Sequence, residues 1–219
     1  MNLNTDPSKR VAIDTRSLEW VASPAAGVMR KMLHRDGDEV AEATSVVRYE
    51  ANSRFEPHQH GLGEEFLVLE GEFCDEHGRY PAGTYVRNPA GSAHAPFTET
   101  GCTIFVKLRQ LAPADQVRRV VDSNQATWVE GPAQGLWSLP LASFGPEKTS
   151  LVRWEAGAAF PAHRCEGGEE IFVVDGEFQD RHGTFRAGTW LRIPHLGEHA
   201  PRSPDGCTLF VKTGHLGQR

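Results

Sequence analysis

Apolar residues fall in short runs along the whole chain, separated by polar and turn-forming residues. Four of these runs are SVVRYE, EFLVLEGEF, GTYVRNP and CTIFVKL, which begin at residues 45, 65, 83 and 102. They are rich in β-branched and aromatic residues and are bounded by Gly, Pro, Asn or Asp, which is typical of strands joined by tight turns. No amphipathic helical stripe separates them, so the pattern favours antiparallel strands in a sandwich or barrel over a parallel β/α sheet.

The pattern repeats along the chain. An ungapped self-alignment at an offset of 105 residues places His163 over His58 and GCTLFVK over GCTIFVK. About half of the positions between residues 45 and 109 are identical to their counterparts, which indicates an internal duplication. We expect two domains, residues 1–112 and 113–219, joined through LAPADQVRR at residues 111–119. We expect each unit to be a small β-barrel, and the two barrels to form an internal pseudo-dimer because each core is small.

Composition narrows the functional classes. The formal net charge of −6 disfavours binding to nucleic acid, whose phosphates are also negative. No apolar run approaches the length of a membrane span, and MNLNTDPSKR has no apolar signal-peptide core, so no membrane partner is expected. The four cysteines show no C-x-x-C spacing, which fits a reduced, cytoplasmic setting.

The segment HQHGLGEEF in the first unit carries the first candidate site. His58 and His60 alternate along a strand and therefore share one face, and glycines allow a tight turn that returns the chain with Glu64 opposite them. His94 follows a Pro-Ala-Gly turn after a neighbouring strand. Imidazoles and a carboxylate that meet on one face predict a divalent-metal site. Glu65 should point to the opposite face, where we expect a surface role.

The second unit repeats this set with one exchange. The equivalent residues are His163, Cys165, Glu169 and His199, so that a cysteine replaces the second histidine. Thiolate favours a soft or borderline ion, and zinc is the first choice here. The interpretation of a vacant site with a buried thiol stays open. Arg87 and Arg192 lie on strands beside the sites and could bind an anionic ligand or form salt bridges with glutamate.

These residues resemble the cupin family, whose motifs are G-x5-H-x-H-x3-4-E-x6-G and G-x5-P-x-G-x2-H. The first unit matches at every motif position except the leading glycine, where Asn52 stands, and asparagine tolerates a left-handed backbone. The second unit departs at Cys165 and at Leu196 and Gly197 in its second turn. The duplicated run most resembles the ChrR-type cupin, the C-terminal domain of a zinc-dependent anti-sigma factor. The resemblance implies two double-stranded β-helix, or jelly-roll, barrels.

The same resemblance bears on partners. Anti-sigma factors of that type carry a helical N-terminal domain with His and Cys zinc ligands that binds the sigma factor. Here about ten residues precede the first strand-like run, and they contain neither His nor Cys. We therefore expect the sensing part without the sigma-binding part, and no direct binding of a sigma factor. A small-molecule ligand inside the barrel and a homodimer are the other partners considered.

Two functions remain open from the sequence. The first is a non-catalytic, zinc- or divalent-metal-binding bicupin in a regulatory or oxidative-stress setting. The second is a metal-dependent dioxygenase acting on a small aromatic or dicarbonyl compound. The histidine-rich first site would accept zinc, iron, nickel or manganese, whereas the thiolate of the second favours a structural or oxidant-sensitive zinc site.

Overall fold

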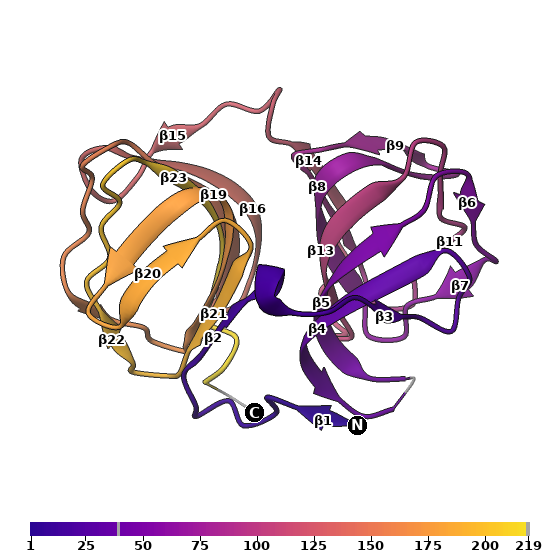
Figure 1. Cartoon of the computed structure of the whole chain (residues 1–219), viewed down its shortest axis with the longest axis horizontal. Helices are drawn as coiled ribbons and strands as arrows, with labels where there is room; N and C mark the ends of the chain where they lie inside the picture. Colours follow the sequence, from indigo (N-terminus) through magenta and orange to yellow (C-terminus); the bar gives the residue numbers. More distant parts are fainter. Residues whose placement is uncertain (39, 218–219) are drawn as a thin grey trace. The chain divides into compact units, whose positions relative to one another are not determined.

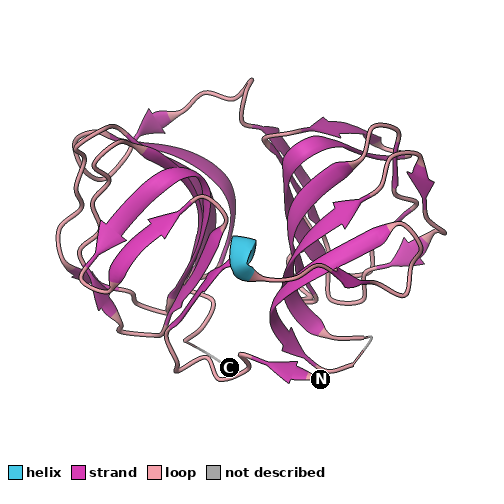
Figure 2. Ribbon diagram, viewed as in Figure 1, coloured by secondary structure: helices cyan, strands magenta, loops and turns pink. Residues whose placement is uncertain are grey.

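The computed structural model describes residues 1–38 and 40–217, and it is built almost entirely from β-strands (Figures 1 and 2). Within these residues the helical content is one 3-10 turn, η1 (Thr15–Ser17). No helix in this part of the chain has the length and apolar character needed to cross a bilayer. The predicted all-β, two-barrel fold is therefore confirmed.

The chain forms two compact units, each composed of two segments. The first unit contains Met1–Thr5 and Leu18–Ala126, and the second contains Asp6–Ser17 and Thr127–Arg219. The duplication alone predicted a single division, with units at 1–112 and 113–219. The compact units differ from that division because a short segment of each repeat pairs with strands of the other repeat.

The first unit is built on an eleven-stranded antiparallel sheet, of which seven strands form the main path. The order of the sheet is β1-β4-β5-β13-β8-β10-β14, and β7 and β11 form a separate pair. The strands are β1 (Asn2–Leu3), β3 (Val21–Ala22), β4 (Val28–Asp36), β5 (Glu42–Tyr49), β6 (Ser53–Arg54), β7 (His58–Gln59), β8 (Glu64–Asp75), β9 (Gly78–Pro81), β10 (Thr84–Asn88), β11 (Ala93–His94), β12 (Phe97–Thr98), β13 (Cys102–Leu108) and β14 (Arg119–Asp122).

The second unit repeats this arrangement. Its sheet has the order β15-β16-β17-β23-β19-β21-β2, and β18 pairs with β22 as β7 pairs with β11. The strands are β2 (Val11–Asp14), β15 (Val129–Glu130), β16 (Leu136–Phe144), β17 (Glu147–Trp154), β18 (His163–Arg164), β19 (Glu169–Asp180), β20 (Gly183–Arg186), β21 (Thr189–Ile193), β22 (Glu198–His199) and β23 (Cys207–Thr213).

The last strand of each main sheet is supplied by the other repeat. In the second unit β2 pairs with β21, with Ile13 opposite Trp190 (Figure 1). In the first unit β14 pairs with β10, with Val121 opposite Tyr85. Each pairing supplies backbone hydrogen bonds to an edge that would otherwise be open. The two repeats therefore exchange equivalent strands.

Each exchanged strand is followed by a tryptophan that packs under an arginine of the next unit. The guanidinium carbon of Arg48 lies 4.3 Å from the ring centroid of Trp20, and that of Arg153 lies 4.3 Å from Trp128. These cation–π contacts are favourable by roughly 0.5–1 kcal/mol each at partly exposed sites. They hold the chain where it enters each new unit.

A buried polar network lies on the face of β8 and β10 that points away from the candidate ligands. Arg87 donates to Glu65 at 3.0 Å and contacts Asp115, and the Tyr85 hydroxyl donates to Glu65 at 2.7 Å. Glu65 is 1% exposed, so the predicted surface role for this residue is wrong. A buried carboxylate needs such partners because its desolvation is costly. Arg87 takes the salt-bridge role that the sequence left open.

Candidate metal centres

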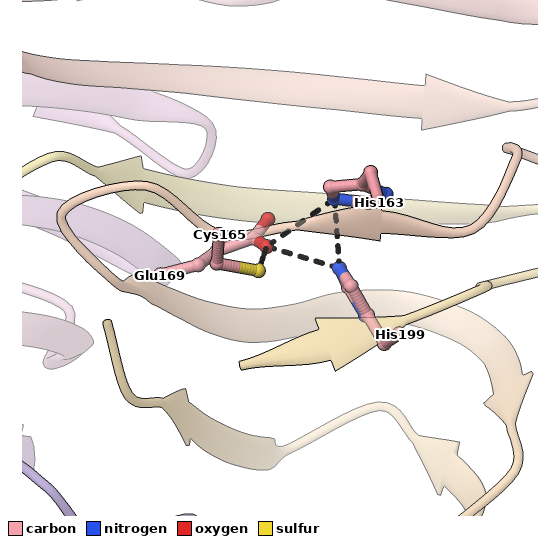
Figure 3. Close-up of side chains that lie close together, drawn as sticks. All are labelled: His163, Cys165, Glu169 and His199. Atoms are coloured by element: carbon pink, nitrogen blue, oxygen red, sulfur yellow. Dashed lines mark hydrogen bonds and ion pairs between the residues drawn. The ribbon is translucent and has the colours of Figure 1, made fainter. Parts of the chain in front are cut away.

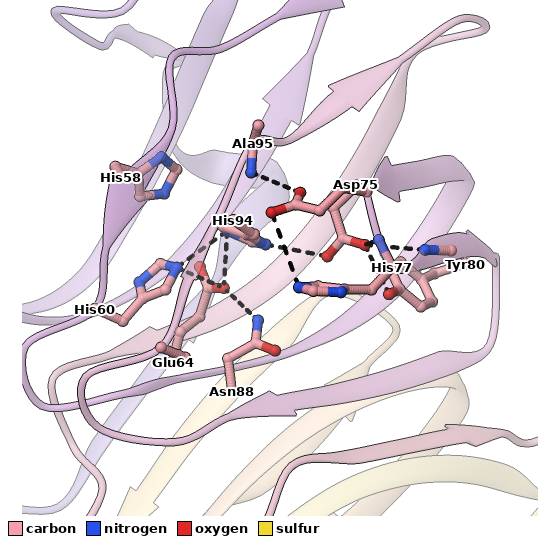
Figure 4. Close-up of polar contacts among 12 residues, drawn as sticks. His58, His60, Glu64, Asp75, His77, Tyr80, Asn88, His94 and Ala95 are labelled. Carbon is pink, nitrogen blue, oxygen red and sulfur yellow. Dashed lines mark hydrogen bonds and ion pairs between the residues drawn. The ribbon is translucent and has the colours of Figure 1, made fainter.

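The first site is formed where β7 and β11 pair beside the start of β8. The pairing places His94 directly opposite His58, and His60 follows two residues later (Figure 4). The donor atoms of these three histidines all lie within 4.8 Å of one another. The Nε2 atoms of His60 and His94 are 3.0 Å apart. The alternation that the sequence predicted thus brings three imidazoles together.

Two of these histidines have their outer nitrogen atoms fixed by acceptors. Nδ1 of His58 lies 3.1 Å from the carbonyl oxygen of Glu56, and Nδ1 of His94 lies 3.2 Å from Oδ2 of Asp75. Because a carbonyl and a carboxylate can only accept, both Nδ1 atoms carry the proton. In the neutral form of each ring, Nε2 then presents a lone pair toward the centre, which is the tautomer that a metal ion requires.

Glu64 adjoins this group from the start of β8. Its Oε2 lies 3.4 Å from His60 Nε2 and 3.7 Å from His94 Nε2, and Asn88 donates to the same oxygen at 3.2 Å. The carboxylate therefore points at two of the three imidazoles and is oriented by an amide on the adjacent strand β10. The structure thus brings the three histidines named from the sequence together and places Glu64 beside two of them.

The electrostatic environment differs among these groups. Burial lowers the pKa of His60 and so keeps it neutral. Burial alone would also lower the pKa of His94, but the hydrogen bond to Asp75 and the charge of Glu64 outweigh it and raise this pKa. Burial likewise opposes ionisation of Asp75, yet hydrogen bonds from His94 and Tyr80 lower its pKa below the ordinary value. Asp75 is thus a charged acceptor behind His94.

The second site has the same scaffold with a different donor set. His163 lies opposite His199 in the β18–β22 pair, and the two Nε2 atoms are 3.1 Å apart (Figure 3). Oε2 of Glu169 lies 3.1 Å from His199 Nε2 and 3.2 Å from the sulfur of Cys165. One donor atom from each of these four residues lies within 4.8 Å of all the others. The predicted second set is therefore also brought together.

Cys165 is a buried thiol that holds its proton. Burial, followed by the charge of Glu169, raises its pKa far above the usual range, and its S–H donates to Glu169. A metal ion would have to displace this proton, because thiolate is the ligating form. Ile193 occupies the position that Asn88 holds in the first unit, so the thiol replaces the amide as a donor to the glutamate.

In each unit, the turn before the last histidine of the set (His94 or His199) donates a hydrogen bond to the backbone of another candidate ligand. Gly91 N donates to the carbonyl of His60 at 2.7 Å, and Leu196 N donates to that of Cys165 at 3.0 Å. Both residues have a left-handed backbone, with φ of 84° and 59°. Asn52 also adopts φ of 62°, which confirms that asparagine fills the glycine position of the first motif.

Each ligand group borders a cavity inside its own unit. The first cavity, about 500 Å³, is lined by His58, Glu64 and His94 together with Tyr49, Phe55 and Phe73. The second is smaller, about 130 Å³, and combines His163, Glu169 and His199 with a largely apolar wall that includes Trp154 and Phe160. Tyr49 and Trp154 are equivalent positions, so each cavity holds one aromatic side chain with a hydrogen-bond donor.

Several residues behind the ligands were not predicted from the sequence. In the first unit they are Asp75, Asn88, Tyr80 and Arg118, which donates to Tyr80, and in the second they are Asp180 and Arg10, which donates to Asp180. The two aspartates could most easily have been predicted, because they recur at the same offset of 105 residues as the ligands, in FCDEHG and FQDRHG. The arginines precede the exchanged strands, and nothing in their sequence context indicates which unit they join.

The residues present fit a divalent metal. In the first unit, the imidazoles of His58 and His94 are oriented by their Nδ1 acceptors, and they lie beside the imidazole of His60. The carboxylate of Glu64 adds an oxygen acceptor, and a cation would satisfy this group of acceptors. In the second unit the donors are two imidazoles, a thiol and a carboxylate, which is a set that zinc accepts. In that unit Nδ1 of His199 is buried and has no hydrogen-bond partner among the described residues.

Comparisons with solved structures show the same fold. A candidate dioxygenase from Nostoc punctiforme superimposes with a TM-score of 0.78 at 14% identity, covering 97% of this chain and 85% of that one. The Ylba protein of E. coli gives 0.73 at 12% identity, with coverage of 95% and 92%. An oxalate decarboxylase from Lactobacillus farciminis gives 0.65 at 12% identity, with coverage of 93% and 86%. At these identities the likeness establishes the fold alone.

Sequence comparison is more specific. No curated protein matches the chain at a significant level. The family model described as the ChrR cupin-like domain matches twice, at residues 8–112 and 116–217. The two matches cover nearly the whole chain and coincide with the duplication, so this protein belongs to the ChrR cupin-like family as a bicupin.

Proposed function

We propose that the protein is a metal-dependent enzyme of the dioxygenase kind, whose first unit binds a small aromatic or dicarbonyl compound at a divalent metal. The observation that carries this proposal is the cavity of the first unit, where His58, Glu64 and His94 line the same space as an aromatic wall. A purely structural metal site is closed by its ligands, whereas this group borders a volume that suits a small molecule.

The chain's own residues supply the metal set and the binding surface. His58, His60, His94 and Glu64 would hold the ion, and a bound iron(II) would supply the electron transfer that dioxygen needs to react with an organic compound. A dioxygenase places both oxygen atoms in its product, so no external reductant is required.

The aromatic wall indicates the class of compound. The Tyr49 ring meets Phe55 edge-on at a centroid distance of 5.3 Å and Phe73 at 5.8 Å. Burial, and secondly the charge of Glu64, raise the pKa of Tyr49 well above its ordinary value, so its hydroxyl keeps its proton and can donate to a carbonyl oxygen. Arg54 also lines the cavity and is exposed, which suits a partly anionic compound.

The test measures metal content and oxygen uptake together. Protein purified without added metal is analysed by mass spectrometry and then offered small aromatic and 1,2- or 1,3-dicarbonyl compounds in an oxygen electrode. We expect iron in the first unit and oxygen uptake that is lost in His58→Ala and reduced in Tyr49→Phe. Stoichiometric zinc in both units without oxygen uptake for any compound would overturn the catalytic proposal.

A second candidate function is an oxidant-sensitive zinc module, and Cys165 favours it. Its sulfur lies among the donors of the second site, and thiolate is the ligand that oxidants attack most readily. Zinc release on peroxide treatment, followed with a chromogenic chelator, should be faster in the wild type than in Cys165→His. Equal release would exclude oxidation of this thiol as the trigger. Both functions can reside in one chain, because they use different units.

A further inference from the structure

The two units differ in how they support the final histidine. In the first unit Nδ1 of His94 lies 3.2 Å from Oδ2 of Asp75, which is a hydrogen bond. In the second unit Nδ1 of His199 lies 4.0 Å from Oδ2 of Asp180, and no hydrogen bond forms. The aspartates are equivalent and both side chains are fully buried, so burial does not explain the difference.

The difference arises from the residue that contacts the aspartate on the side away from the metal site. Tyr80 donates its hydroxyl to Oδ1 of Asp75 at 2.8 Å (Figure 4). The same hydroxyl accepts a hydrogen bond from Arg118 at 2.7 Å. The backbone N–H groups of His77 and Gly78 also donate to Oδ1. All these donors act on Oδ1, which leaves Oδ2 for the histidine.

In the second unit phenylalanine stands at the equivalent position, and the arginine reaches the aspartate directly. Phe185 has no hydroxyl to stand between them, and Arg10 donates to Oδ2 of Asp180 at 2.8 Å. The guanidinium carbon of Arg10 lies 5.9 Å from the Phe185 ring. Arg10 thus occupies the oxygen that, in the first unit, accepts from the histidine.

Both arginines come with the exchanged strands. Arg118 immediately precedes β14 and Arg10 immediately precedes β2, and the registers of these strands place the two residues at equivalent positions. The exchanged strand therefore places a guanidinium beside the aspartate in each unit. The residue at position 80 or 185 determines whether that guanidinium bonds to a tyrosine hydroxyl or to the aspartate itself.

We propose that Tyr80 is a positioning residue that makes the first site the tighter metal site, by keeping Arg118 off the oxygen of Asp75 that orients His94. Phe185 lets Arg10 take that oxygen, which leaves His199 without its supporting acceptor. The proposal depends on metal binding by the histidines, as in the proposed function, but not on catalysis. Outer partners of this type change metal affinity by about 10- to 100-fold.

The test is a cobalt(II) titration of the whole chain, since the two sites differ spectroscopically. Cobalt bound at Cys165 gives a thiolate charge-transfer band, whereas cobalt at the first site gives d–d bands without it. We expect Tyr80→Phe to weaken the first site about tenfold and to leave the thiolate band unchanged. Phe185→Tyr should tighten the second site.

A double variant distinguishes positioning from general damage. In Tyr80→Phe, Arg118 is free to contact Asp75 as Arg10 contacts Asp180, so adding Arg118→Ala should restore part of the lost affinity. A hydroxyl needed only for folding gives no such rescue. The matched control is Tyr85→Phe, which removes a buried hydroxyl of the same unit that contacts Glu65 and leaves Asp75 untouched.

The outcomes separate the two proposals. If the wild type binds cobalt at the first site but Tyr80→Phe binds it equally well, the positioning role is wrong and metal binding stands. If the double variant is as weak as Tyr80→Phe, competition by Arg118 is wrong. If no cobalt binds at the histidines, both this inference and the proposed function fail.

Discussion

The backbone N–H of Leu196 donates to the carbonyl oxygen of Cys165 at 3.0 Å, so a residue with a left-handed backbone is hydrogen-bonded to a candidate metal ligand. The first unit places Gly91 in this role, and a Cβ added to Gly91 would have no heavy atom within 4 Å. Space is therefore available for a side chain at this turn. The free-energy cost of a side chain there comes from the left-handed backbone conformation, which disfavours residues other than glycine.

Leu196→Gly should stabilise the second unit by about 0.5 kcal/mol. Removing the left-handed penalty of roughly 1–2 kcal/mol outweighs the added freedom of the unfolded chain, which costs about 0.4–1 kcal/mol. The reverse change, Gly91→Leu, should destabilise the first unit by a similar or larger amount. Chemical denaturation checks both, and a loss of stability in Leu196→Gly would show that Leu196 makes contacts of its own.

His58→Ala should remove one equivalent of metal and lower the thermal stability of the metal-loaded protein. Binding to the folded state alone stabilises it, so loss of the ion removes that contribution. Wild-type metal should also leave as the pH falls through the imidazole range, because a protonated imidazole cannot ligate. The control is His77→Ala, an exposed turn residue of the same unit, which should retain full metal content.

The four cysteines should react slowly with a thiol reagent in the native protein, because all are free and buried. Burial raises the pKa of Cys74 and Cys207 to about 11 and that of Cys102 to about 12. Below these values the thiolate fraction, and with it the reaction rate, should rise about tenfold per pH unit. Rapid labelling of one native cysteine at pH 8 would contradict this, while all four should react after unfolding.

These raised pKa values also affect stability. A thiol that holds its proton more tightly in the folded state favours folding below the unfolded-state pKa of about 8.5. That contribution is lost as the pH rises through about 11. The free energy of unfolding of the metal-free protein should therefore decline across this alkaline range, and substitution of Cys207 by alanine should make the decline shallower.

Arg87→Met should destabilise the first unit by about 3–5 kcal/mol, because it leaves buried Glu65 and Asp115 without their cation. Replacing Glu65 by leucine and Asp115 by asparagine in the same chain should recover much of the loss, because it removes the unpaired charges. Denaturant unfolding of the single and combined variants measures both effects. A single variant as stable as wild type would mean that water reaches the network.

The ligand positions could be predicted because the chemistry and the local geometry are both encoded in short stretches. Alternation along a strand places His58 and His60 on one face, and the glycines of the turn bring Glu64 back to them. The buried role of Glu65 could not be predicted in this way. Alternation correctly placed it on the other face, but whether that face is covered depends on elements distant in sequence.

The strand exchange could not be predicted for a different reason. Val11–Asp14 (VAID) and Arg119–Asp122 (RVVD) are short strands of the same length that end in aspartate, and their partners on the sheets, β21 and β10, are alike. Pairing within a repeat or across repeats would satisfy the same backbone groups and side chains. Only the path of the chain distinguishes the alternatives, so Arg10 and Arg118 could not be assigned to their sites beforehand.

The exchange of strands also suggests how the gene arose. A half-length ancestor with this sequence pattern would complete its sheet with a strand from a second molecule, so obligate pairing would have preceded the fusion of two copies. It also follows that the genetic order of the segments is arbitrary. A circularly permuted gene that begins at Thr127 and joins the present ends through a flexible linker would encode Thr127–Arg219 first. Only the linker and Met1–Thr5 would then separate that segment from Asp6–Ser17, and Leu18–Ala126 would follow as one uninterrupted stretch.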